Sequence, residues 1–176
     1  MIRAITTVIV AALVIGVAHA QENDEPPPGA GQNGNFHILQ LWTGDEDRFM
    51  AEWAHPTPPN LTTTTRMERN QPLTQFILFS NCTPDIDGKC LLNAAIEIFQ
   101  PDGEYYGDVL TFPAYDNHPA PPADLLVIAP NSIGIRIEDG ELLGGYLVRM
   151  TVTDVHGGRM AVSELTLEAV EATISD

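Results

Sequence analysis

Basic residues are scarce in this chain of 176 residues. It has 8 Lys and Arg against 24 Asp and Glu, a net charge of −16 at pH 7. Such a chain repels the phosphates of nucleic acids and of anionic lipids, so we expect no nucleic-acid partner. Cationic partners and divalent ions are allowed, although acidity alone usually indicates only a solvated surface.

The chain also lacks an apolar run long enough to span a bilayer. Its main apolar run, residues 5–17, follows Arg3 and precedes the cleavage pattern Ala18-His19-Ala20. We therefore predict that residues 1–20 are a signal peptide and that the mature chain begins at Gln21. The short signal and the preference for arginine over lysine look bacterial. This predicts export to the periplasm or the cell exterior, with no membrane span.

Recognisable catalytic and cofactor motifs are missing as well. We find no nucleophile elbow, zinc-protease motif, P-loop or dinucleotide-binding glycine pattern. The four histidines of the mature chain lie beside turns, loops or a chain end, and none has metal-ligand spacing with another; they are His37, His55, His118 and His156. We expect no catalytic residue, no cofactor and no metal site, and predict that the chain is not an enzyme. The alternative is an accessory hydrolase or redox protein whose site is assembled from scattered residues.

Only two cysteines are present, Cys82 and Cys90. They stand at the feet of two apolar runs, residues 73–80 and 91–99, which are rich in β-branched and aromatic residues and therefore predict strands. We expect these strands to pair antiparallel, which would bring the cysteines close enough for a disulfide. Such a bond persists in oxidising compartments and agrees with export. A redox pair or a zinc site is the weaker interpretation, because the chain has no C-x-x-C motif.

The loop between the cysteines contains Asp85-Ile86-Asp87-Gly88, which has the alternation and the glycine that begin a calcium-binding loop. It lacks the remaining oxygen ligands and the distal glutamate of such a loop. We interpret the stretch as a tight turn, and the sequence does not decide whether Asp85 and Asp87 bind a divalent ion.

Turn signals recur every eight to twelve residues along most of the chain, and two of the runs between them, 61–68 and 146–154, alternate apolar and polar residues. Strands are predicted at 36–42, 61–68, 73–80, 91–99, 104–112, 125–129, 133–137, 146–154 and 160–170, with a helical turn at 45–53. Residues 21–35 are rich in Pro and Gly and predict a disordered leader. Residues 36–172 predict a single all-β domain, an antiparallel β-sandwich.

Three stretches resemble an immunoglobulin-like β-sandwich of the fibronectin type III or macroglobulin-module kind. Pro101-Asp102-Gly103 is similar to the P-x-G turn of such modules, Gly144-Gly145-Tyr146-Leu147-Val148 resembles their G-x-Y-x-V strand entry, and residues 152–170 look like their final hairpin. The resemblance implies that the Tyr146 hydroxyl bonds back to the preceding backbone. It carries over no functional residue, because these modules share a fold and not an activity.

The stretch from Pro113 to Pro122 contains four prolines and predicts a long loop that crosses between sheets. Prolines restrict its conformations, so less entropy would be lost when a partner orders it. Tyr115 and His118 add large side chains with polar tips, a type favoured at interfaces. We therefore predict an exported, non-catalytic binding or assembly module with a protein partner, and Tyr115 and His118 as its possible interface. Alternatively, the stretch is only a connection.

Overall fold

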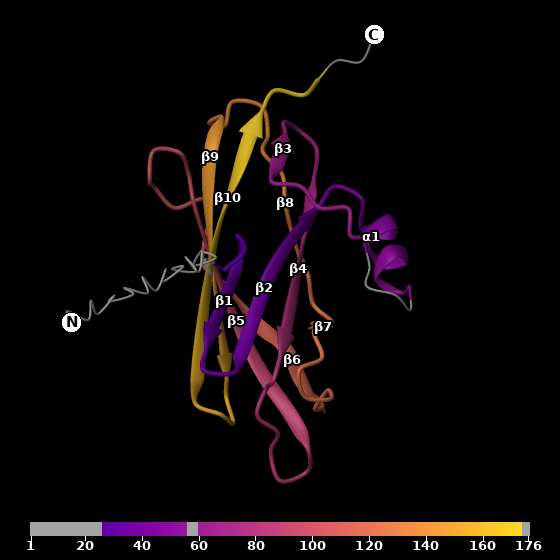
Figure 1. Cartoon of the computed structure of the whole chain (residues 1–176). Coiled ribbons are helices and arrows are strands. Elements are labelled where there is room, and N and C mark those ends of the chain that lie inside the picture. Colours follow the sequence, from indigo (N-terminus) through magenta and orange to yellow (C-terminus); the bar gives the residue numbers. More distant parts are fainter. Residues whose placement is uncertain (1–25, 56–59, 174–176) are drawn as a thin grey trace, which may run out of the picture.

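The structure is a computed structural model that describes residues 26–55 and 60–173. The predicted signal peptide and the first residues of the predicted leader lie outside this range. Two five-stranded sheets and one short helix make up the described chain (Figure 1). The predicted all-β class is confirmed.

The first sheet has the strand order β1-β2-β4-β7, and β8 also pairs with β4. Its strands are β1 (Ala30–Asn33), β2 (Phe36–Thr43), β4 (Leu73–Ser80), β7 (Val127–Ile128) and β8 (Ile133–Ile135). All the pairings are antiparallel. Because β7 and β8 are short and separate, this edge of the sheet is interrupted.

The second sheet has the order β3-β10-β9-β5-β6. Its strands are β3 (Arg66–Glu68), β5 (Lys89–Phe99), β6 (Leu110–Pro119), β9 (Gly144–Asp154) and β10 (Arg159–Val170). The β3–β10 pair is parallel and the others are antiparallel. The inner faces of the two sheets share one apolar core, which includes Phe36, Trp42, Phe79, Ile96 and Tyr146.

The expected disordered leader is wrong for its last residues, because β1 lies within 26–35. Gly31 of β1 approaches β10 so closely that a Cβ at this position would lie 2.2 Å from the carbonyl oxygen of Val162. Only glycine allows that approach. Gly31, one of the glycines that predicted flexibility, therefore serves close packing here.

The predicted pairing of residues 73–80 with 91–99 is also wrong, because β4 and β5 lie in different sheets. Both strands turn large apolar residues toward the core, so they face each other across it. The disulfide between Cys82 and Cys90 is nevertheless confirmed, with a Cα–Cα distance of 6.1 Å. It closes the loop by which the chain crosses from the first sheet to the second.

The proline-rich stretch is a strand for most of its length, so the predicted loop from Pro113 to Pro122 is wrong. β6 runs to Pro119 as an edge strand, and its register with β5 shifts twice. Proline is tolerated there because an edge strand needs hydrogen-bond donors on one side only. Conversely, the strand predicted at 104–112 forms only from Leu110 onward.

Helix α1 (Glu46–Trp53) packs on the outer face of the first sheet. Figure 1 shows it on the side away from β9 and β10. The Asp45 carboxylate caps the helix by accepting a hydrogen bond from the Arg48 backbone N–H at 3.0 Å. The buried Phe49 ring stacks on Phe76 of β4, with centroids 4.2 Å apart. Within the described ranges, no helix is long and apolar enough to cross a membrane.

Candidate functional site

An apolar groove of about 640 Å³ lies between α1 and the segment around β7. We call it the α1 groove. It is lined by Glu46, Met50, Trp53, Phe76, residues 125–130 and Ser132. Helix α1 forms one wall, the segment around β7 forms the other, and β4 contributes the floor.

The sequence builds this groove because β4 is apolar on both faces. Ile77 and Phe79 point into the core between the sheets, while Phe76 and Leu78 point outward. Phe49 covers part of this outward surface, and the remainder forms the floor of the groove. An amphipathic helix of only eight residues is too short to cover the whole face.

The walls of the α1 groove expose large apolar side chains to solvent. The exposed fractions are 43% for Met50, 49% for Leu125 and 37% for Leu126. Single exposed apolar residues are ordinary, but adjacent ones that line a groove are typical of an interaction site. Leu126 also lines a second hollow with His37, Leu39 and the first described prolines, so the apolar surface continues toward β1.

The charges at the α1 groove are all of one sign. Within the described part of the chain, Glu46 is the one charged residue in its lining. Asp45, the N-cap of α1, and Asp47, in its acidic first turn, are the neighbours of Glu46 in the chain. A positive helix N-terminus favours these carboxylates. The result is an apolar groove with an acidic margin.

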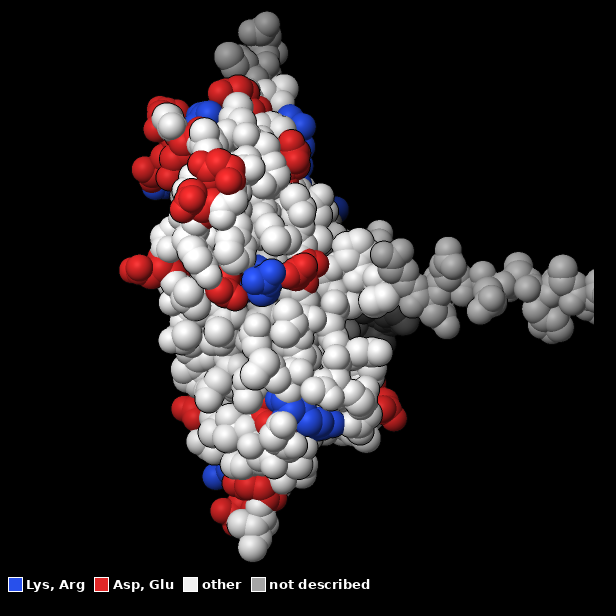
Figure 2. Space-filling model, turned by 90° about the vertical axis from the view of Figure 1, so that its left-hand side faces the viewer, with Lys and Arg blue, Asp and Glu red and all other residues white. Residues whose placement is uncertain are grey.

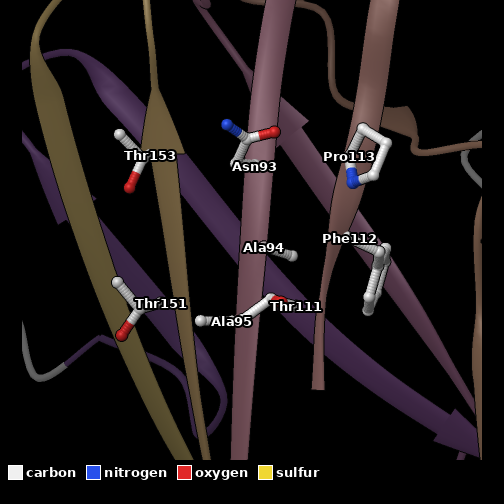
Figure 3. Close-up of a pocket in the computed structure, with 8 residues that line it drawn as sticks. All are labelled: Asn93, Ala94, Ala95, Thr111, Phe112, Pro113, Thr151 and Thr153. Atoms are coloured by element: carbon white, nitrogen blue, oxygen red, sulfur yellow. The ribbon is translucent and has the colours of Figure 1, made fainter. Parts of the chain in front are cut away.

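A third, shallower hollow of about 350 Å³ lies on the outer face of the second sheet (Figure 3). Asn93 is opposite Thr153, and Ala95 is opposite both Thr151 and Thr111. These side chains are small and uncharged, so they leave a dent without a titratable group or a nucleophile activated by a base. Its chemistry is that of an ordinary solvated sheet face.

The end of the molecule that carries the disulfide holds a fully buried carboxylate, Asp154. Its Oδ2 accepts hydrogen bonds from the Thr83 backbone N–H at 3.0 Å, the Thr83 hydroxyl at 2.8 Å and the Arg159 guanidinium at 2.7 Å. Arg159 also donates to the Asn81 carbonyl at 2.8 Å and to the Asn35 side chain. This cluster links three connections between strands, the β1–β2 turn, the β4–β5 loop and the β9–β10 turn. Because Arg159 compensates the charge of Asp154, we interpret the cluster as a structural anchor.

Asp85 and Asp87 lie in the disulfide loop. Asp85 Oδ1 accepts hydrogen bonds from the backbone N–H groups of Asp87 at 2.9 Å and Lys89 at 2.8 Å. The bond from Lys89 lowers the pKa of the Asp85 carboxyl. In the part of the chain that the structure describes, no group of three or more His, Cys, Asp or Glu side chains could hold a metal ion.

Tyr115 and His118, the predicted interface residues, both lie on β6 and differ in exposure. The half-buried Tyr115 ring meets Phe79 edge to face at 4.9 Å, and its hydroxyl donates to the Pro119 carbonyl at 2.8 Å. Burial raises the pKa of this tyrosine. His118 is exposed, with its ring 5.1 Å from that of Tyr115. An interface role for these two residues stays a prediction.

Acidic side chains gather toward the ends of the face shown in Figure 2, above all near the C-terminus. Near this end Tyr146 donates its hydroxyl to the Leu142 carbonyl at 2.8 Å, four residues back, as the immunoglobulin-like resemblance implies. The neighbouring Tyr106 hydroxyl lies 3.1 Å from Glu141 Oε2. Burial and then this carboxylate raise the pKa of Tyr106 to about 12.

Comparisons with known proteins give little for this chain. No protein-family model matches it, and no curated protein does. One solved structure that resembles it is a family 123 glycoside hydrolase from Clostridium perfringens, described in connection with glycolipid glycan hydrolysis. The TM-score is 0.41 and the identity 12%, over 77% of this chain and 28% of that chain. The chain thus spans little more than a quarter of that neighbour's length.

This finding corrects one expectation. The neighbour is an enzyme, which contradicts our prediction that the chain is not an enzyme, and we withdraw that prediction. A likeness at this TM-score assigns no catalytic residue, substrate or activity to the chain.

Proposed function

We propose that the protein is an exported binding or assembly module that holds a partner protein in the α1 groove. The observation that carries the proposal is the groove itself, an apolar surface whose walls expose Met50, Leu125 and Leu126. Exposing such a surface costs free energy in water, which a partner recovers by covering it.

The groove is a preformed site, which supports a binding role. The Phe49–Phe76 stack holds α1 against the sheet. Glu52 ties α1 to the following segment by accepting from the Thr62 backbone N–H at 2.6 Å and hydroxyl at 2.8 Å. A hydrogen bond from the Arg48 side chain lowers the pKa of the Glu52 carboxyl most, and the two bonds from Thr62 lower it further. A rigid site loses little conformational entropy when a partner binds.

Export is part of the proposal and has two supports. The first 20 residues follow the pattern of a cleaved signal peptide. The Cys82–Cys90 disulfide is a type of bond that persists in the periplasm and outside the cell. Sequencing of the exported protein should start at Gln21, and a retained Met1 would contradict this part of the proposal.

We also propose that the two sheets belong to the immunoglobulin-like class. The order β2-β4-β7 in one sheet and β10-β9-β5-β6 in the other supports this assignment. The chain crosses between the sheets from β4 to β5, as it does after the second strand of such domains. The class supplies a rigid support and does not itself decide the activity.

Photocrosslinking in the native host tests the binding role. The photoreactive residue p-benzoylphenylalanine is placed at Leu125 in the groove, or at Val162 on the second sheet as a control of similar exposure, 45%. We expect one discrete adduct with a protein from the Leu125 position and none from Val162. Adducts of equal yield and pattern at both positions, or none at Leu125, would overturn the proposal.

A further inference from the structure

We infer that the segment held in the α1 groove is amphipathic and cationic, with apolar side chains in the groove and Lys or Arg residues at its acidic margin. This inference rests on the proposed function, because it names the partner chemistry of the same site. It follows from the apolar lining, the sign of the charges around the lining and the charge of the whole chain.

The apolar half of the partner follows from the lining. Apart from Glu46 and Ser132, the described residues that line the groove have apolar side chains, with Phe76 almost fully buried in its floor. A polar side chain placed against Phe76, Leu125 or Leu126 would lose its hydration without gaining a hydrogen-bond partner from these side chains. The anchors that enter the groove are therefore aliphatic or aromatic.

The cationic half of the partner segment follows from the acidic margin of the α1 groove. The nearest side-chain partner of the Glu46 carboxylate is the Thr74 hydroxyl, at 3.5 Å, which leaves Glu46 able to accept a stronger bond. Among the residues that the structure describes, no Lys or Arg lines the groove. Arg48, the one basic residue of α1, is held by Glu52 at 2.8 Å. A basic side chain on the partner would thus meet the Glu46 carboxylate, whose charge is not neutralised by the described lining of the groove.

Two other occupants conflict with these charges. Residues 21–25 of this chain contain Glu22, Asp24 and Glu25 and would bring acids to an acidic margin. A second copy of the chain would bring together two molecules of net charge −16. Repulsion between like charges at the contact therefore disfavours both of these occupants. A cationic partner is instead attracted from a distance, and this attraction weakens as salt rises.

The experiment uses two 15-residue peptides with the same leucine positions on one helical face, one with lysine and the other with glutamate on the opposite face. Fluorescence anisotropy measures their binding to the mature protein. We expect the lysine peptide to bind at least tenfold more tightly than the glutamate peptide. Glu46→Gln should weaken the lysine peptide several-fold. Equal binding of the two peptides, or no binding of either, would overturn the inference.

A matched pair of variants separates groove binding from general attraction to an acidic protein. Met50→Glu and Val162→Glu add the same charge at positions exposed to 43% and 45%, the first in the groove and the second on the other sheet. We expect Met50→Glu to weaken the lysine peptide at least tenfold, although it makes the protein more acidic, and Val162→Glu not to weaken it. Equal effects would mean that the peptide binds through charge alone and would contradict the inference.

The two proposals can fail separately. If photocrosslinking at Leu125 yields a discrete adduct but the lysine peptide does not bind, the binding role stands and the partner chemistry is wrong. If neither occurs, both are wrong. Unchanged circular dichroism and melting temperature of Met50→Glu show that a loss of binding is not a loss of fold, and Leu125→Glu provides a second groove variant.

Discussion

Asp154 is fully buried and relies on Arg159 and Thr83 to compensate its charge. Taking both members of such a pair out of water is costly, so the net gain over an apolar pair is small. Removing only one member of the pair is strongly destabilising, because the charge of the other member is then left uncompensated. The pair therefore fixes how the β9–β10 turn meets the disulfide loop.

Asp154→Ala should lower the free energy of unfolding by about 3–5 kcal/mol, because it leaves Arg159 and the Thr83 N–H without their shared acceptor. Urea denaturation measures the change. Glu164→Ala breaks the exposed ion pair with Arg149 and should cost less than about 1 kcal/mol. Similar losses in the two variants would show that Asp154 is no anchor.

The environment of Tyr106 makes the free energy of unfolding depend on pH in the alkaline range. Its pKa is about 12 in the folded protein, above the ordinary value of 10, so the folded state holds this proton more tightly than the unfolded state. The contribution to stability is complete below pH 10 and is lost as the pH rises toward 12. Tyr106→Phe should reduce the slope of stability against pH in that window. An unchanged slope would contradict the assignment.

Among the elements, the connection between β4 and β5 matters most for the fold. It carries the chain from one sheet to the other, and the disulfide closes it into a short ring. Cross-linking this ring restricts the unfolded chain, which raises the free energy of unfolding. The disulfide thus stabilises the fold by constraining the loop that connects the two sheets.

Replacing both Cys82 and Cys90 by serine should lower the free energy of unfolding by about 2–3 kcal/mol, the value expected for a ring of this length. The far-UV spectrum should keep its strand signature. Calorimetry of the variant and of the oxidised parent measures the difference. A melting temperature equal to that of the parent would show that the disulfide has no structural role.

The elements differ in how well the sequence predicts them. Local apolar patterning indicates β2, β4, β5, β9 and β10 correctly, because alternation fixes the buried face of most of these strands and β4 is a short run that is apolar on both faces. It does not fix the pairing partner, so nothing local separates a β4–β5 hairpin from a crossing between sheets. The glycine of β1 illustrates a second limit: Gly31 is required by the proximity of Val162, which is 131 positions away in the chain.

The α1 groove was not predictable from the sequence for the same reason. Its walls come from Met50 and Leu125, and its floor comes from Phe76, three residues brought together only by the fold. A weak signal was present in Leu125-Leu126, two adjacent leucines in a proline-rich region. Tyr115, which the sequence favours as an interface residue, instead places its ring against Phe79.

At the scale of the whole molecule, the disulfide end and the acidic C-terminal end are both held by internal contacts, whereas the α1 groove is left uncovered among the residues that the structure describes. The net charge of −16 surrounds this groove with a field that favours cationic partners. A two-sheet support, an open apolar groove and the negative charge of the chain are the features on which the proposed binding role rests.

The most direct test of this account is the affinity of the purified protein for the partner captured at Leu125. It is measured by calorimetry for the parent, for Leu125→Glu in the groove and for Met160→Glu on the second sheet, where Met160 is 55% exposed. We predict that Leu125→Glu raises the dissociation constant at least tenfold and that Met160→Glu changes it less than twofold. Equal dissociation constants for the two variants would contradict the account.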